Sequence, residues 1–296
     1  MMLTERIESL CGTMDVIPTG EEPKLTKLSG IKAVVFDVYG TLLISGSGDV
    51  GTAIAVDSSA ALSESLAAAG FEGDLEKAGI RGKELLREFI EHHHHLCKLC
   101  SIWYPEVDII EIWTKVLAEL HKEGILTTEV AELEKIKALG VEYECRVNPT
   151  WPMPDCTDLL SNVAASEKVM GIVSNAQFYT PLLFETFFDK KVSALGFDPE
   201  CCIWSCDVGE GKPSHKLFDR VLGTLMVKYN IRAEETVYVG NDMLNDVSTA
   251  QKAGCKTVLF AGDNRSLRWR EGDERVAGIE PDAVITELSQ LNEVLG

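Results

Sequence analysis

One short stretch constrains the fold more than any other, because an apolar run there ends abruptly at a carboxylate. Residues 33–36 read Ala-Val-Val-Phe, and Asp37 follows at once. A short run of this kind predicts a buried strand of a parallel sheet. Ligands bind at the carboxyl ends of such strands, and a carboxylate there can attack an electrophile. This stretch alone leaves a second interpretation open, in which Asp37 caps the following turn.

Segments typical of strands and of helices alternate after about residue 149. This alternation predicts an α/β fold, in which a Rossmann-like parallel sheet carries helices on both faces. The expected strands are 168–173, 202–205, 236–239, 256–260 and 283–285, and the expected helices are 155–165, 179–188, 214–228, 244–253 and a last one that reaches Leu295.

A helical pattern of about a hundred residues separates the first strand from the others, which is far more than a crossover needs. Its apolar residues recur at helical spacing, with Gly79 and Gly82 as possible breaks. The expected helices there span residues 57–70, 75–99, 107–120 and 129–139.

The position of this helical block predicts two domains. We expect an N-terminal extension over 1–30, an α/β core over 31–47 and 149–296, and an inserted all-helical cap domain over 48–148. The hinges of the cap are expected near Gly46–Gly51 and Asn148–Pro154, because these stretches are rich in Gly or Pro and interrupt the helical pattern.

The composition limits the class of partner. A net charge of −19 would repel a phosphate backbone, which argues against nucleic acid. The one basic cluster, Arg265–Arg270, is short and is followed by Glu271 and Asp273. No apolar run approaches the length of a membrane span, and the first residues lack a secretory pattern, so no membrane association is expected. Nine cysteines without such a signal predict reduced thiols in the cytoplasm.

Four consecutive histidines, His92–His95, precede Cys97 and Cys100. The Cys-X-X-Cys spacing is that of a zinc site. No second cysteine pair with matching spacing follows, and the helical pattern places these thiols on an apolar face, where a free cysteine acts as a small hydrophobe. Whether this cluster has a role is therefore left open.

Polar residues at the ends of further segments could converge on Asp37. They are Ser174 and Asn175 after one strand, Lys212 at a helix start, and Asp242 and Asp246 after another strand. Singly, each has a structural explanation, such as a helix cap or a solvated cation. Together they offer a nucleophile, a hydroxyl, a cation and a carboxylate pair, which suit chemistry on an anionic substrate. The acids would also supply the oxygen ligands that Mg²⁺ prefers.

In this order the motifs resemble those of the haloacid dehalogenase superfamily of hydrolases. The matching segments are Asp37-Val-Tyr-Gly-Thr41, Ser174-Asn175, Lys212-Pro213 and Gly240-Asn-Asp242-Met-Leu-Asn-Asp246, and the helical block matches a cap domain of that family. The resemblance implies that Asp37 attacks the substrate. It implies substrate binding by Thr41, Ser174, Asn175 and Lys212, with Ser174 and Lys212 holding the transferred group. It also implies Mg²⁺ as the cofactor, held by Asp37, Asp242, Asp246 and the backbone carbonyl of Tyr39.

Tyr39 takes a catalytic position at which phosphatases of that family usually carry a second Asp. That Asp protonates the leaving group and later activates water, whereas a phenol with a pKa of about 10 is a poor acid–base catalyst at neutral pH. The 2-haloacid dehalogenases of the family carry Tyr here and Ser-Asn in the second motif, and a leaving halide needs no proton. They use no metal, however, and they carry a Tyr where this chain has Phe218.

The paired acids of the fourth motif favour the phosphatase pattern, because carboxylates facing Asp37 without a cation would repel one another. We therefore expect a Mg²⁺-dependent phosphatase, a monomer or homodimer, that acts on a small anionic phosphorylated metabolite through a covalent intermediate on Asp37. The alternatives are a 2-haloacid dehalogenase, hydrolysis of a different bond, and a ligand-binding protein without turnover. Candidate substrate contacts in the cap are Arg81, Lys83, Arg87, His92–His95, Trp103 and Tyr104.

Overall fold

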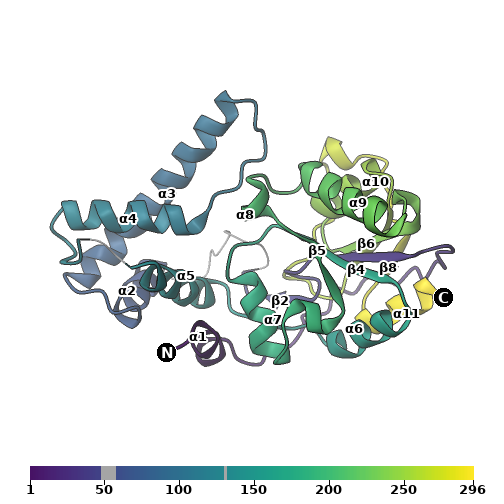
Figure 1. Cartoon of the computed structure of the whole chain (residues 1–296), viewed down its shortest axis with the longest axis horizontal. Helices are drawn as coiled ribbons and strands as arrows, with labels where there is room; N and C mark the ends of the chain where they lie inside the picture. The colour runs from purple at the N-terminus through teal and green to yellow at the C-terminus, as the bar shows by residue number, and fades with distance from the viewer. Residues whose placement is uncertain (48–57, 130–131) are drawn as a thin grey trace.

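A six-stranded parallel sheet forms the centre of the larger part of the molecule (Figure 1). The structure, a computed structural model, describes residues 1–47, 58–129 and 132–296. The strand order is β5-β4-β1-β6-β7-β8, and every neighbouring pair is parallel. The predicted α/β fold is therefore confirmed. The strands are β1 (Ala33–Phe36), β4 (Val169–Ser174), β5 (Phe197–Trp204), β6 (Thr236–Gly240), β7 (Lys256–Phe260) and β8 (Ala283–Ile285).

β1 lies in the middle of the sheet, which explains its wholly apolar sequence. It pairs with β4 on one side and β6 on the other, so that Phe36 lies between Ile172 and Val239. Its side chains alternate, as the strand pleat requires: Val34 and Phe36 join one hydrophobic cluster, and Val35 joins another. Because β1, β4 and β6 are parallel neighbours, the residues that follow them meet at one edge of the sheet.

Helices cover both faces of the sheet (Figure 1). α6 (Cys156–Ala165), α7 (Thr180–Phe188) and α11 (Leu291–Leu295) share a hydrophobic cluster with one face. α9 (Lys216–Tyr229) and α10 (Thr249–Lys252) pack against the other, and a single turn, α8 (Ser205–Val208), follows β5. The main difference from the sequence prediction lies after β6, where a π-helical turn, Met243–Ser248, precedes α10.

Four helices lie beside the sheet around a hydrophobic cluster of their own (Figure 1). Gly79 and Gly82, the possible breaks, do not interrupt the helix, since α3 continues through both and spans 25 residues. A Cβ atom on Gly79 would lie 2.0 Å from Ser63 Oγ, so glycine there lets two helices approach closely. α5 begins and ends later than predicted, and residues 57, 130 and 131 of the expected helices lie outside the described residues. The helices are α2 (Ser58–Ala68), α3 (Leu75–Leu99), α4 (Ile109–Lys122) and α5 (Leu133–Val147).

A small antiparallel ladder joins the two connections between this helical block and the sheet. β2 (Leu43–Ser45) pairs with β3 (Thr150–Pro152). At the end of the ladder, Ser45 Oγ donates to Asn148 Oδ1 at 2.8 Å, and Gly46 N donates to Pro149 O at 2.8 Å. The two predicted hinges thus lie side by side, although residues 48–51 of the first lie outside the described part of the chain. The sequence analysis did not predict this ladder.

The N-terminal extension links the helical block to the sheet layer. Its helix α1 (Leu3–Leu10) packs against α5 and α7, and Arg6 pairs with Glu142 of α5. Further along, Lys24 bridges to Val284 of β8. None of the helices in the described residues combines the length and the apolar character needed to cross a bilayer.

Candidate active site

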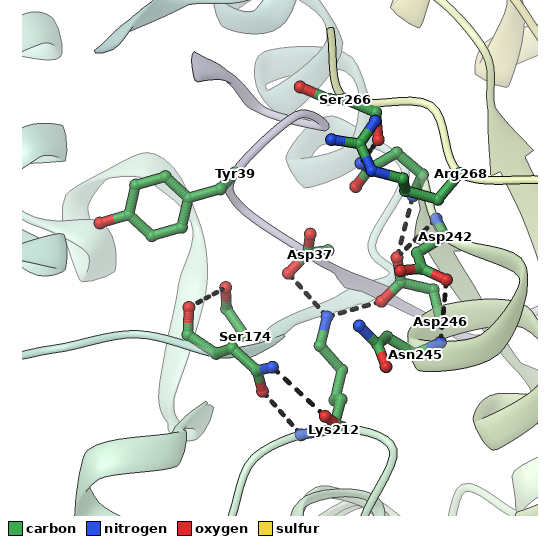
Figure 2. A pocket seen from close by; sticks show the side chains of 11 residues that line it. Asp37, Tyr39, Ser174, Lys212, Asp242, Asn245, Asp246, Ser266 and Arg268 are labelled. Carbon is green, nitrogen blue, oxygen red and sulfur yellow. Dashed lines mark hydrogen bonds and ion pairs between the residues drawn. The ribbon is translucent and has the colours of Figure 1, made fainter. Parts of the chain in front are cut away.

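A cavity lies at the carboxyl edge of the sheet, where the residues after β1, β4 and β6 meet (Figure 2). Seven of the eight predicted site residues line it, and Thr41 lies behind its wall. The cavity is lined by Asp37, Tyr39, Ser174, Asn175, Lys212, Asn241, Asp242, Asn245, Asp246, Ser266 and Arg268. The structure therefore brings together segments that are far apart in the sequence.

Lys212 is the central cation of the cavity (Figure 2). Its buried Nζ atom donates to Asp37 Oδ1 at 2.7 Å, to Asp246 Oδ1 at 2.6 Å and to Tyr238 OH at 2.9 Å. Burial lowers the pKa of Lys212, but the attraction of the Asp246 and Asp37 carboxylates is larger and raises this pKa above its usual value. Lys212 is therefore positively charged at neutral pH and can neutralise an anion bound beside Asp37.

Asp246 anchors this lysine and the turn after β6. Its Oδ1 accepts from Lys212 Nζ and from Tyr238 OH, and its Oδ2 accepts from the backbone N–H groups of Asn241 and Asp242 at 3.0 and 2.9 Å. Burial raises the pKa of Asp246 to about 7, although Lys212 opposes this rise. Since both oxygens already accept two hydrogen bonds, Asp246 would have to exchange one of them to bind a metal directly, and that role stays a prediction.

Asp242 faces a second cation, Arg270. The guanidinium contacts both carboxylate oxygens, with Nε 3.0 Å from Oδ1 and 3.2 Å from Oδ2 and a further contact from the terminal nitrogen. Oδ1 also caps the π-helical turn by accepting from the backbone N–H groups of Leu244 and Asn245 at 2.8 and 3.2 Å. The sequence analysis expected Lys212 as the one cation beside these acids, and the structure adds Arg270 as a second.

The second-motif residues hold the lysine loop in place. Asn175 Oδ1 accepts from the backbone N–H of Lys212 at 2.6 Å, and Asn175 Nδ2 donates to its carbonyl at 3.4 Å. The Lys212–Pro213 peptide bond is cis. Ser174, which is buried, lines the cavity beside Asn175. Thr41 Oγ1 donates to Asn241 Oδ1 at 3.1 Å, so that Thr41 orients a lining residue.

Tyr39 lines the cavity, but its ring points away from Asp37 (Figure 2). The hydroxyl lies 2.9 Å from Thr180 Oγ1 in a buried hydrogen bond. Burial, followed by the nearby charge of Glu144, raises the pKa of Tyr39 well above its usual value. The phenol is therefore neutral and engaged elsewhere, and only its backbone stays close to the nucleophile.

The loop after β7 supplies residues that the sequence analysis missed. Ser266 and Arg268 line the cavity, and Arg270 reaches Asp242. These residues lie in the basic cluster that was considered only as a possible nucleic-acid patch. Gly40 allows the loop to approach, because its φ is +79° and a Cβ atom there would lie 2.4 Å from Ser266 Cβ. The glycine within the nucleophile motif was the one sequence signal for this contact.

The histidine and cysteine cluster on α3 does not line this cavity. His93 Nε2 lies 3.4 Å from Cys97 Sγ, one helical turn away. In the part of the chain that the structure describes, no group of three or more His, Cys, Asp or Glu side chains is arranged to hold a metal ion. The possible metal role of His92–His95 thus gains no support from the structure.

The loop between α3 and α4 docks onto the loop that carries Lys212. The backbone N–H of Glu106 donates to Gly209 O at 3.1 Å, and that of Gly211 donates to Tyr104 O at 2.9 Å. The half-buried carboxylate of Glu106 accepts from Ser205 Oγ at 2.7 Å and from Gln177 Nε2 at 3.2 Å. The helical block therefore contacts the core through this loop as well as through its two chain connections.

Glu106→Gln should flatten part of the pH dependence of stability. Burial raises the pKa of Glu106 above its usual value, so the unfolded state loses the proton at lower pH than the folded state does. The free energy of unfolding should then fall as pH rises from the unfolded pKa through the folded one. Urea unfolding of the wild type and Glu106→Gln across this range measures the difference.

The exposed Glu111 of α4 provides the control. Glu111→Gln should keep the wild-type pH dependence, and Glu106→Ala should cost about 1–3 kcal/mol because it leaves hydrogen-bond donors unpaired. Equal pH dependence in the wild type and Glu106→Gln would contradict the assignment.

Known proteins are similar to this chain in sequence and in fold. A sequence model of one family, described as haloacid dehalogenase-like hydrolase, matches residues 31–254. A phosphoglycolate phosphatase from Photorhabdus laumondii is 31% identical over 274 residues, which cover 91% of this chain and 94% of that protein. A glyceraldehyde 3-phosphate phosphatase from Pyrococcus furiosus is 36% identical over 87 residues, which cover 29% of this chain and 32% of that protein. A solved 2-haloacid dehalogenase from Pseudomonas syringae pv. tomato has the same fold, with a TM-score of 0.54 and 24% identity over 89% of this chain and 97% of that one.

Proposed function

We propose, because this chain belongs to the haloacid dehalogenase-like hydrolase family, that it hydrolyses the phosphate ester of a small metabolite through a covalent intermediate on Asp37. The observation that carries the proposal is the position of Asp37, which follows the central strand and lies 2.7 Å from the buried cation Lys212. The names of two relatives, phosphoglycolate phosphatase and glyceraldehyde 3-phosphate phosphatase, support a phosphorylated substrate.

The proposed reaction has two displacement steps. Lys212 engages Asp37 Oδ1, and Asp37 Oδ2 attacks the phosphorus atom while the bond to the ester oxygen breaks and its electron pair leaves with that oxygen. The released alkoxide takes a proton from solvent. Water then attacks the phosphorus of the acyl phosphate and gives a proton to solvent, the bond to Asp37 breaks with its electron pair returning to the carboxylate, and inorganic phosphate leaves. Lys212 and the Ser174 hydroxyl bind the negative phosphoryl oxygens in both steps.

The oxygen donors of this site suit Mg²⁺, although in the described residues no three acidic side chains are grouped to hold a metal ion. Asp37, the backbone carbonyl of Tyr39 and Asp242 would hold it, since hard oxygen donors are the ligands that Mg²⁺ prefers. The ion would supply positive charge against the phosphoryl oxygens. Two features of the chain act against it, because Lys212 engages Asp37 Oδ1 and Arg270 engages both oxygens of Asp242.

A 2-haloacid dehalogenase is the second candidate, and one observation favours it. Lys212 and Arg270 pair with Asp37, Asp246 and Asp242, so two cations of the chain itself offset the charge of these carboxylates. Asp37 would then displace a halide from carbon, and water would hydrolyse the resulting ester.

One substrate screen tests both candidates. The purified protein is incubated with a panel of phosphate monoesters and of 2-haloacids, in Mg²⁺ or in EDTA, and phosphate or halide release is measured. We expect phosphate release in Mg²⁺ only. Halide release in EDTA would replace the phosphatase proposal with the dehalogenase one. Release of neither product would contradict both and leave hydrolysis of a different bond or binding without turnover.

The helical block is proposed as the cap that selects the substrate. It comprises residues 48–148, with the core formed by 31–47 and 149–296, and its own hydrophobic cluster supports this division. The loop that carries Trp103 and Tyr104 approaches the Lys212 loop through the contact of Tyr104 O with Gly211 N. We also propose that the protein works in the cytoplasm, where its nine free thiols would stay reduced.

A further inference from the structure

The loop that carries Arg270 is joined by backbone hydrogen bonds to the turn that carries Asp242. The N–H of Arg268 donates to Asn241 O at 3.0 Å, and the N–H of Met243 donates to Arg268 O at 2.9 Å. These two bonds hold the backbone of Arg268 against the fourth motif, and Arg270 follows two residues later. The backbone of the loop therefore positions Arg270 beside Asp242.

The backbone of Arg270 has an unusual conformation. Its φ is +57°, in the left-handed region that residues other than glycine seldom adopt. Such conformations persist where the surrounding structure holds them, and they gather at functional sites. Here the conformation accompanies a guanidinium that contacts both oxygens of Asp242.

The two carboxylate oxygens of Asp242 have different partners. Oδ1 accepts from the backbone N–H groups of Leu244 and Asn245 as well as from Arg270. Among the described residues, Oδ2 has no hydrogen-bond donor other than Arg270. If the contact between Oδ2 and Arg270 breaks, Oδ1 can still accept the two backbone hydrogen bonds that cap the π-helical turn.

We propose that Arg270 is a resident counter-cation at Asp242 and that a divalent cation binds there by displacing it. This inference rests on the metal site of the proposed function. A Mg²⁺ ion binds oxygen at about 2.0–2.1 Å, so it and the guanidinium compete for Oδ2. In the metal-free protein, Arg270 neutralises Asp242. Metal binding must break this ion pair, so it is weaker by the free energy of the Arg270–Asp242 pairing.

Isothermal titration of the full-length protein with Mg²⁺ tests this exchange. Arg270→Gln should bind Mg²⁺ roughly tenfold more tightly than the wild type, which corresponds to a pairing free energy of about 1.4 kcal/mol. Arg270→Lys keeps a positive charge but loses the two-oxygen contact, so its affinity should lie between the two. The melting temperature gives a second readout, since the rise on adding Mg²⁺ should be larger in Arg270→Gln.

Arg275 provides the matched control, because it lies in the same loop and pairs with Asp273 at a more exposed position. Arg275→Gln should bind Mg²⁺ as the wild type does. Equal tightening by Arg275→Gln and Arg270→Gln would overturn the inference, because it would show a general charge effect. If Arg270→Gln does not fold, Arg270→Lys and Arg275→Gln carry the same comparison.

The outcomes separate this inference from the proposed function. Equal Mg²⁺ affinity in the wild type and Arg270→Gln, together with Mg²⁺-dependent phosphate release, would overturn the exchange and leave the phosphatase intact. Absence of Mg²⁺ binding by either protein at millimolar concentration would overturn the exchange and the metal site together. Tighter binding by Arg270→Gln supports the exchange, whatever substrate the enzyme hydrolyses.

Discussion

Asp37→Asn should reduce turnover by roughly 10³-fold or more, because the amide cannot act as the nucleophile that forms the covalent intermediate. The fold should remain, since asparagine has nearly the same volume and its side-chain oxygen can still accept from Lys212. Lys212 also keeps its contact with Asp246 at 2.6 Å. Single-turnover assays of the purified variant on the best substrate from the screen measure the loss.

Asp282→Asn is a suitable control for this substitution. Asp282 accepts from Thr257 N at 2.9 Å, next to β8 and outside the cavity lining. The Asp282→Asn variant should keep wild-type turnover, and both this variant and Asp37→Asn should melt cooperatively. A wild-type rate in Asp37→Asn, with deamidation excluded by mass spectrometry, would show that another group attacks the substrate.

The rate of phosphate release should depend steeply on the pKa of the leaving alcohol. Tyr39 stands where related phosphatases carry an acid, and its hydroxyl bonds to Thr180 instead of facing Asp37. None of the described residues that line the cavity is a histidine, so the cap histidines are not placed to replace the missing acid. General acid–base catalysis contributes ~10²–10⁴-fold, so aryl and acyl phosphates should react faster than alkyl phosphates by a comparable factor.

Tyr39→Asp tests the same idea from the opposite direction. It places a carboxyl group at the usual position of the acid, and it should raise the rate on alkyl phosphates more than the rate on aryl phosphates. Tyr39→Phe is the matched control, because it removes the hydroxyl and keeps most of the packing; it should preserve the leaving-group dependence. The melting temperature of each variant is measured first, since Tyr39 is buried. A flat dependence in the wild type, with chemistry rate-limiting, would refute a missing acid.

The sequence determined the sheet, the place of Asp37 and most of the lining residues. Ala33 to Phe36 had to be a central strand, because a wholly apolar run is stable only where both faces are covered. Parallel strands then place their carboxyl ends at one edge, so Ser174, Asp242 and Asp37 were predictable as neighbours. The helical block was equally visible, since its apolar spacing is a local property of the chain.

Only the tertiary structure decided which charges pair inside the site. Lys212 contacts Asp246 across 34 residues and Asp37 across 175 residues, and Arg270 contacts Asp242 across 28 residues. The path of the loop after β7 decided the last of these pairs, because it brought part of the basic cluster Arg265–Arg270 against the fourth motif. Residue spacing encodes strand and helix periodicity, but the partner of a charge depends on how loops pack after the sheet is formed. For this reason the acids were predictable from the sequence, and the cations that balance them were only partly so.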